Sequence, residues 1–591
     1  MFLRCTQRKK NGKEHRYWSI VENRRLPNGR VAQRHVLYLG EISDSQEHAW
    51  AKSIEVFQDG HTQPQTLTLF PEDRVADTVD DASLVRLRLS ELSVHRPRQW
   101  GACWLALVLW RELGLDQFWA QRLPASRKGT RWDLVLAVLA IYRLVAPGSE
   151  WRLHRQWFES TALGDLLGAD LSLSEAHRLY RCHDHLLTHK AALFTYLTER
   201  WRDLFNAQFD VLLYDLTSTY FESDPPFPEG DKRRFGYSRD KRPDCVQVVI
   251  ALIVTVEGLP LAYEVLSGNT RDSTTLRDFL KKIESQYGKA RRTWIMDRGI
   301  PTEEVLAEMR ACEPTVQYLV GTPKGRLTKL EKDLLDKPWQ EVRPGVTVKL
   351  LACEGEVYIL ARSEDRAGKE RAMRRRQLKW LWKRLKELQA MCPKREALLM
   401  KLGAARQQAS RAWRLVRIDI HPTEASFTYQ LLKDKLRQVR RREGRYLLRT
   451  NLTETDPSVV WTYYMQLVTV EQAFRNLKGD LAVRPIFHQE EPRIEAHIFV
   501  SFLAYCLHVT LGRRLWRLAP GLTPRSVLEK LAGIQRVDVQ IPTSDGRTVI
   551  LQRTTQPEAD VKLLLERLKL DLPAQPLPRI TRAAGRIEAA L

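Results

Sequence analysis

The sequence predicts a mixed α/β protein of several domains, and three observations carry that prediction. The chain has 591 residues, which is too long for one hydrophobic core. Apolar residues make up 43% of it, and Trp, Tyr and Phe occur 17 times each, so we expect globular folding and not disorder. Hydrophobic periodicity also changes along the chain from strand-like to helical and back, which indicates regions of different architecture.

Charge indicates a polyanionic partner. Lys and Arg number 95 against 72 for Asp and Glu, which gives a formal net charge of +23 and a pI near 9.7. A field of that sign attracts nucleic acids or anionic membrane surfaces. A merely solvating charge is the other interpretation, so charge alone does not decide the function.

Compartment and membrane signals favour a cytoplasmic protein with no membrane partner. The eight cysteines are scattered and form no C-x-x-C pair, which suits a reducing compartment and gives no sign of a zinc ribbon. The charged N-terminus lacks a following apolar run, so we expect no signal peptide. The longest apolar runs, such as Ile498–Thr510, fall short of the roughly 20 residues that span a bilayer.

The first 208 residues divide into two predicted units. Residues 1–75 are predicted to be a small β-rich basic unit, because 15–40 alternate around a Pro-Asn-Gly turn. One face of this hairpin is basic, and either DNA or solvent suits it. Residues 85–208 carry apolar residues at helical spacing and are predicted to form an all-helical domain. DNA-end binding by a helix-turn-helix and an ordinary helical core both fit that pattern.

From residue 209 the pattern predicts a mixed sheet flanked by helices. Three consecutive strands, a helix (273–287), a strand, a helix from Thr302 and a short strand follow one another, and the first three strands suit an antiparallel meander. This core is predicted over 209–324 and 445–516. The insertion 325–444 combines strands with very basic helices that suit a solvated face or a phosphate backbone, and 517–591 is a tail that is a candidate for dimerisation.

Two acids stand at the predicted ends of buried strands. Asp215 follows the apolar run Val211–Tyr214, and Asp297 follows Thr293–Met296. A single acid at a strand end commonly caps a turn or forms a salt bridge. Two carboxylates at the same sheet edge repel each other unless a cation or proton is shared. Hard divalent ions such as Mg²⁺ prefer this kind of ligand.

Glu471 is the candidate for a third acid. If its surroundings are helical, Tyr464, Glu471, Arg475 and Lys478 lie at i, i+7, i+11 and i+14 and share one face. A carboxylate beside Tyr, Arg and Lys suits a site that holds a metal and contacts phosphate. An exposed helix with an ordinary i, i+4 Glu–Arg pair fits the same spacing.

The chain resembles the DDE transposases of bacterial insertion sequences, in the group with a Tyr-Arg-Glu-Lys signature. The resemblance rests on YDLTSTYFE, on GYSRDKRPDCVQVVIALIVTVEGLPLAYEVLSGNTRDSTTL and on WIMDRGI. VEQAFRNLK and RPIFHQEEPRIEAHIFVSFLAY complete it. These stretches cover about 210–320 and 445–510 and occur in the family's order. One position departs from the signature, because Leu467 stands where it has arginine. Arg475, one turn beyond Glu471, is a candidate replacement.

The resemblance implies a ribonuclease H-like catalytic core that a long insertion interrupts. It implies Asp215, Asp297 and Glu471 as catalytic metal ligands for two Mg²⁺ ions, with Mn²⁺ as a substitute. One metal then activates a water that attacks the transposon end, the other stabilises the leaving 3′ oxygen, and the freed 3′-hydroxyl attacks target DNA. It further implies binding of terminal inverted repeats and target DNA, a homodimer in the synaptic complex, and a cytoplasmic, nucleoid-associated protein. The DNA-binding candidates are Tyr464, Arg475, Lys478 and Arg298.

Two other functions remain open from the sequence. A metal-dependent nuclease on the same fold would share the three acids, but it would not need a separate end-binding region. An inactive DNA-binding regulator would keep the basic surface, although all three acids are present. A membrane-surface protein fits least, because the basic helices lack a matching apolar stripe.

Overall fold

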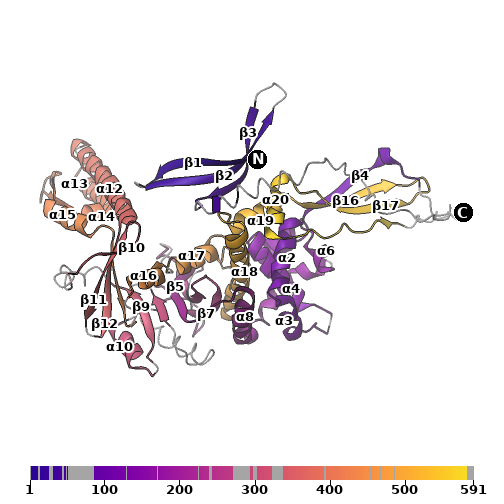
Figure 1. The fold of residues 1–591 in the computed structure, drawn as a ribbon, viewed down its shortest axis with the longest axis horizontal. Coiled ribbons are helices and arrows are strands. Elements are labelled where there is room, and N and C mark those ends of the chain that lie inside the picture. The colour runs from indigo at the N-terminus through magenta and orange to yellow at the C-terminus, as the bar shows by residue number, and fades with distance from the viewer. Residues whose placement is uncertain are drawn as a thin grey trace.

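The structure is a computed structural model of the 591-residue chain (Figure 1). It describes residues 2–581 apart from these: 11–12, 26–30, 43–45, 48–49, 51–85, 128, 170, 224, 226, 238–241, 271–292, 297–301, 314, 323–329, 331–336, 354, 392–393, 453–455, 466 and 485.

The N-terminal unit is a three-stranded antiparallel sheet of β1 (Phe2–Lys10), β2 (Lys13–Arg25) and β3 (Val31–Gly40). The predicted hairpin is confirmed as β2–β3, and β1 is an additional strand. The sheet docks on the C-terminal part of the chain. Trp50 donates its indole N–H to Pro520 O at 2.9 Å, and Lys530 Nζ donates to Val36 O at 2.6 Å.

The next stretch is mainly helical, as predicted, but it shares its core with the rest of the chain. One element is not helical: β4 (Ser93–Gln99) pairs with a C-terminal strand. Sequence periodicity missed β4 because its partner lies more than 400 residues away. The helices are α2 (Gly101–Glu112), α3 (Leu115–Arg122), α4 (Trp132–Val145), α5 (Glu150–Arg152), α6 (Leu163–Leu167), α7 (Ala176–His183) and α8 (Lys190–Phe205).

A nine-stranded mixed sheet forms the middle of the chain, in the order β10-β11-β12-β15-β9-β8-β5-β6-β7. The predicted meander is confirmed, because β5, β6 and β7 pair antiparallel in sequence, while β8 and β9 add parallel strands beside β5. The predicted helix 273–287 lies outside the described residues. The elements are β5 (Val211–Phe221), β6 (Val246–Thr255), β7 (Pro260–Ser267), β8 (Thr293–Met296), α10 (Glu303–Ala311) and β9 (Gln317–Gly321).

Close backbone packing fixes the segment that precedes β6. A Cβ atom on Gly268 would lie 1.9 Å from Gln247 O and 2.5 Å from Arg234 O, so only glycine fits there. Gly268 N donates to Lys232 O at 2.9 Å, and the Gln247 amide donates to Gly268 O at 2.9 Å. These contacts hold the 232–237 segment against the end of β6.

The insertion contributes strands to the central sheet and a small core of its own. β15, which directly follows the insertion, pairs antiparallel with β9, and the insertion strands β12, β11 and β10 follow outward. The helices and the β13–β14 hairpin pack around a separate apolar cluster that includes Leu381, Leu398 and Phe427. They project from one end of the molecule in Figure 1. The elements are β10 (Gln340–Arg343), β11 (Val346–Cys353), β12 (Glu356–Ser363), α12 (Glu364–Met391), α13 (Arg395–Gln408), α14 (Ser410–Trp413), β13 (Val416–Ile420), β14 (Phe427–Leu431), α15 (Lys433–Arg442) and β15 (Arg445–Thr450).

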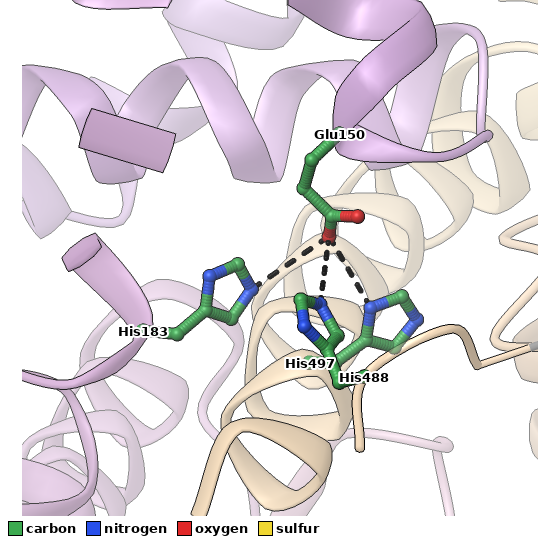
Figure 2. A group of neighbouring side chains, drawn as sticks. All are labelled: Glu150, His183, His488 and His497. Carbon is green, nitrogen blue, oxygen red and sulfur yellow. Dashed lines mark hydrogen bonds and ion pairs between the residues drawn. The ribbon is translucent and has the colours of Figure 1, made fainter. Parts of the chain in front are cut away.

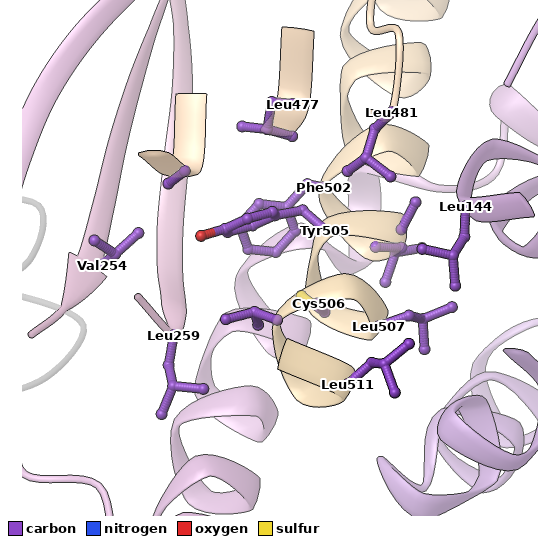
Figure 3. Packing of buried hydrophobic residues seen from close by; sticks show 14 of the residues in the cluster. Leu144, Val254, Leu259, Leu477, Leu481, Phe502, Tyr505, Cys506, Leu507 and Leu511 are labelled. Carbon is purple, nitrogen blue, oxygen red and sulfur yellow. The ribbon is translucent and has the colours of Figure 1, made fainter. Parts of the chain in front are cut away.

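Helices α16 (Pro457–Met465), α17 (Leu467–Lys478) and α18 (Glu491–Leu518) follow. By length and composition α18 could cross a membrane, but 94% of its most apolar window is buried inside the structure. It contacts α2, α4, α7 and β7. Figure 3 shows Phe502, Tyr505 and Leu507 of α18 packed among residues of α4 and of the β6–β7 turn.

The C-terminal part returns to the helical region. Strands β16 (Gln535–Pro542), β17 (Thr548–Thr554) and β18 (Arg579–Ile580) join β4 in a four-stranded sheet. Helix α19 (Pro524–Leu531) begins with a capping box at Thr523 and Ser526, and it packs on α2. Helix α20 (Ala559–Leu568) packs on α18. Because α19 directly precedes β16 and β4 directly precedes α2, the packing of α19 on α2 holds β16 beside β4.

Burial of His508 on α18 predicts a loss of stability in acid. Burial lowers the pKa of His508 from 6.5 to about 4, so the folded protein keeps this ring neutral when the unfolded chain already binds a proton. Stability is therefore lost as pH falls from about 6.5 to about 4, by up to about 3 kcal/mol. In urea unfolding at pH 7 and pH 4.5, His508→Gln should reduce this pH-dependent loss. An unchanged pH dependence in the variant would contradict the assignment.

Candidate active site

Asp215 lies in the middle of β5, not at a strand end as the sequence predicted. The strand continues to Phe221 because β6 pairs with it along its whole length, with Asp215 opposite Leu252. Beside it, the described pairing of β5 with the parallel strand β8 includes Tyr214 and Met296. Asp215 is half-buried, and its Oδ1 accepts a hydrogen bond from Leu216 N at 2.8 Å.

The second predicted acid, Asp297, and the candidate DNA contact Arg298 lie outside the described residues. The described strand β8 ends at Met296, the residue bonded to Asp297. Met296 is the parallel partner of Tyr214, and Tyr214 is bonded to Asp215. In the sequence, Asp215 therefore directly follows Tyr214, and Asp297 directly follows Met296, the residue paired with Tyr214 in the neighbouring strand.

Glu471 lies on α17 with an exposed side chain. Ala473, Phe474 and Leu477 form the buried face of this helix, whereas Glu471, Arg475 and Lys478 share another face at i, i+4 and i+7. No ion pair joins Glu471 to Arg475, although the structure describes both side chains. The ordinary Glu–Arg pair, left open by the sequence, is therefore absent.

Two signature positions fall near a gap in the described residues. Tyr464 belongs to α16 and Leu467 begins α17, on either side of residue 466, and their side chains are outside the described part of the structure. Helix is thus confirmed on both sides of residue 466. The face that Tyr464 was expected to share with Glu471 stays a prediction.

The fold places the helix that carries Glu471 against the strand that carries Asp215. Helix α17 packs on β5, although some 250 residues separate them in the sequence. Carboxylate oxygens are hard ligands that suit Mg²⁺ or Mn²⁺ better than thiolate-binding metals. A half-buried Asp215 beside a helix with an exposed Glu471 therefore fits a divalent cation in the chemistry of its donors.

Cationic groups near the end of β5 were not singled out by the sequence. The Arg242 and Arg484 guanidinium groups lie over the Tyr220 ring, 4.9 Å and 5.7 Å from its centroid. Arg242 also pairs with Glu222 and Asp244. Their contacts with Tyr220 could not be read from the sequence, because Arg484 lies far from Tyr220 along the chain.

A second polar cluster is buried elsewhere, and sequence analysis did not single out its residues. Three histidines surround Glu150 in Figure 2: His183, His488 and His497. Burial lowers the pKa of His183 to about 3 and that of His497 to about 4, so both rings are neutral at pH 7. Burial alone would raise the pKa of Glu150, but the neighbouring rings of His488, His497 and His183 hold that pKa well below its ordinary value.

Two segments of the chain match known protein families. Residues 207–507, just over half of it, match the family model described as Transposase DDE domain. Residues 3–58 match the model of the IS1634 family transposase N-terminal domain. Among curated proteins, none matches the chain. A cryo-EM structure of the piggyBac transposase synaptic complex with hairpin DNA is 10% identical, with a TM-score of 0.34, over 73% of this chain and 79% of that one.

Proposed function

The chain belongs to the DDE transposases of bacterial insertion sequences, and from that premise we propose that it cleaves transposon ends and joins the 3′-OH ends to target DNA. Asp215, Asp297 and Glu471 are the proposed catalytic acids. The single observation that carries the proposal is the packing of α17 on β5, which brings the helix of Glu471 to the strand of Asp215.

Strand order supports a ribonuclease H-like core for this site. In the order β7-β6-β5-β8-β9, three antiparallel strands adjoin two parallel ones, and the first and fourth strands of the chain order lie side by side at the centre. We propose that Asp215 and Asp297 leave these two neighbouring strands close together. Two adjacent carboxylates favour a bound cation, because otherwise their charges repel.

The three carboxylates would hold divalent cations, Mg²⁺ or Mn²⁺. When bound, such cations activate the attacking oxygen and neutralise charge on the leaving oxygen. The protein's own residues then bind and orient DNA. Arg475 and Lys478 follow Glu471 on the same helix face and are proposed phosphate contacts, with Tyr464 and Arg298 as further candidates.

The basic insertion is a proposed second DNA contact. Helix α15 exposes Arg437, Arg440 and Arg441, and α12 exposes Arg375 and Lys379. Phosphate contacts of this kind supply sequence-independent affinity that falls as salt rises. We propose that inverted repeats and target DNA are bound as double strands and that two copies of the chain pair the two ends.

A strand-transfer assay tests the function. Purified full-length chain with Mg²⁺ is mixed with a labelled duplex carrying the element's terminal repeat and with a supercoiled plasmid. The expected result is label covalently joined to plasmid through the 3′ end of the repeat. Cleavage without joining would favour the nuclease alternative, and repeat binding without cleavage would favour an inactive regulator.

A further inference from the structure

The buried cluster around Glu150 converges on a single carboxylate oxygen. Oε1 of Glu150 lies 3.3 Å from His497 Nδ1, 3.4 Å from His488 Nε2 and 3.7 Å from His183 Nε2. All four side chains are at most 5% exposed. One ligand atom from each residue can be chosen so that all four atoms lie within 4.8 Å of one another (Figure 2).

Hydrogen bonding leaves a lone pair of His183 facing the carboxylate of Glu150. His183 Nδ1 lies 3.0 Å from Leu179 O, and because a carbonyl only accepts, this nitrogen carries the proton. In the neutral ring, Nε2 then presents a lone pair toward the Glu150 carboxylate, which is repulsive. Among the described residues, His183 Nε2 and both ring nitrogens of His497 are buried without a hydrogen-bond partner. Buried polar atoms rarely stay unsatisfied.

The three distances that meet at Glu150 Oε1 are close to those in the ligand shell of a small tetrahedral metal. Zn²⁺ binds imidazole nitrogen and carboxylate oxygen at about 2.0–2.2 Å, so a regular tetrahedron has ligand–ligand edges of roughly 3.3–3.5 Å. The separations of 3.3, 3.4 and 3.7 Å around Glu150 Oε1 lie close to that range. Three imidazoles also favour zinc over Mg²⁺, which prefers oxygen ligands.

We propose that Glu150, His183, His488 and His497 bind one Zn²⁺ ion in a closed structural site, separate from the carboxylate site on β5 and α17. Glu150 begins α5 and His183 ends α7, whereas His488 precedes α18 and His497 lies within it. The ion would therefore fasten the N-terminal helices to the segment that joins α17 to α18. All four positions being filled by protein is typical of structural and not catalytic zinc.

Arg143 supplies the competing explanation. Its NH2 group lies 3.8 Å from Glu150 Oε1, and its NH1 donates to Ala482 O at 3.1 Å. A metal-free cluster would then be a buried Arg–Glu pair with the three histidines beside it. That arrangement balances the charge of Glu150 but leaves the His183 lone pair facing the carboxylate. It also predicts no response to chelators.

Metal analysis of the full-length chain, purified without an affinity tag, tests the proposal. We expect about one zinc per chain by inductively coupled plasma mass spectrometry, and loss of that zinc in His183→Gln and in His497→Gln. His508→Gln is the matched control, because it changes a buried histidine of α18 outside the cluster. Wild-type protein without zinc after supplementation, or equal zinc loss in His508→Gln, would overturn the proposal.

Two further readouts keep the test decisive if the variants fail to fold. A strong chelator should lower the melting temperature of the wild type, and added Zn²⁺ should restore it. Co²⁺ loaded in place of zinc should give the intense visible absorption of a tetrahedral site. A melting temperature that ignores both chelator and zinc, or Co²⁺ spectra of an octahedral ion only, would instead support the metal-free Arg143 pair. None of these readouts depends on transposase activity.

Discussion

Replacing Asp215 with asparagine is expected to abolish cleavage of transposon ends while leaving DNA binding intact. The amide keeps the shape of the side chain and can still accept the hydrogen bond from Leu216 N, so the fold should persist. The substituted side chain lacks the negative charge that would hold a divalent cation. Such a loss removes several kcal/mol of transition-state stabilisation, so the rate should fall on the order of 10³-fold or more. Single-turnover cleavage of a labelled end measures this effect.

Asp210 offers a matched control for that experiment. It is exposed and immediately precedes β5, five residues before Asp215. Asp210→Asn should cleave at the wild-type rate, and gel-shift assays should show equal repeat binding by both variants. Wild-type cleavage by Asp215→Asn would remove this residue from the catalytic site.

Replacing Glu356 with glutamine is expected to destabilise the central sheet strongly. Glu356 is buried and accepts hydrogen bonds from Arg449 Nε at 2.6 Å, from Arg310 at 2.8 Å and from the Tyr318 hydroxyl. These contacts join β12, β15, β9 and α10. Removing one partner of a buried ion pair leaves an uncompensated charge and costs about 3–5 kcal/mol. Urea unfolding followed by circular dichroism should show a correspondingly lower midpoint.

Glu303 provides the comparison for the buried pair. It also contacts Arg449, at 2.8 Å, but its side chain is 58% exposed. Glu303→Gln should therefore cost less than about 1 kcal/mol, since exposed pairs contribute little. Equal destabilisation by both changes would show that burial does not control the energetics of this network.

Local patterns predicted the middle of the fold well. Strands β6 and β8 are buried at every described position, and such strands appear in the sequence as continuous apolar runs. The pattern could not place Asp215 within its strand, because the polar residues Thr217, Ser218 and Thr219 beyond the apolar run are still buried and paired with β6. Nor could it show that β12 and β15 extend the central sheet, since pairing between distant strands leaves no local signal.

The candidate sites differ in how far the sequence could reveal them. Glu471 could be proposed from the sequence because Arg475 and Lys478 accompany it at helical spacing within a motif that resembles the family's signature. The zinc candidate was missed because Glu150, His183 and the two histidines near α18 are widely separated in the chain. Each looks like an ordinary core or helix-end residue by itself. Only the packing of α18 against α4 and α7 brings them together.

The central claim is that Asp215 binds a divalent cation during DNA cleavage and joining, and a metal-switch experiment tests it most directly. Thiolate is a softer ligand than carboxylate, so Asp215→Cys should accept Mn²⁺ better than Mg²⁺. The prediction is that Asp215→Cys is inactive with Mg²⁺ and regains strand transfer with Mn²⁺, while Asp215→Ala stays inactive with both. Strand transfer by Asp215→Ala, or equal activity of Asp215→Cys with the two metals, would contradict a metal-binding role for Asp215.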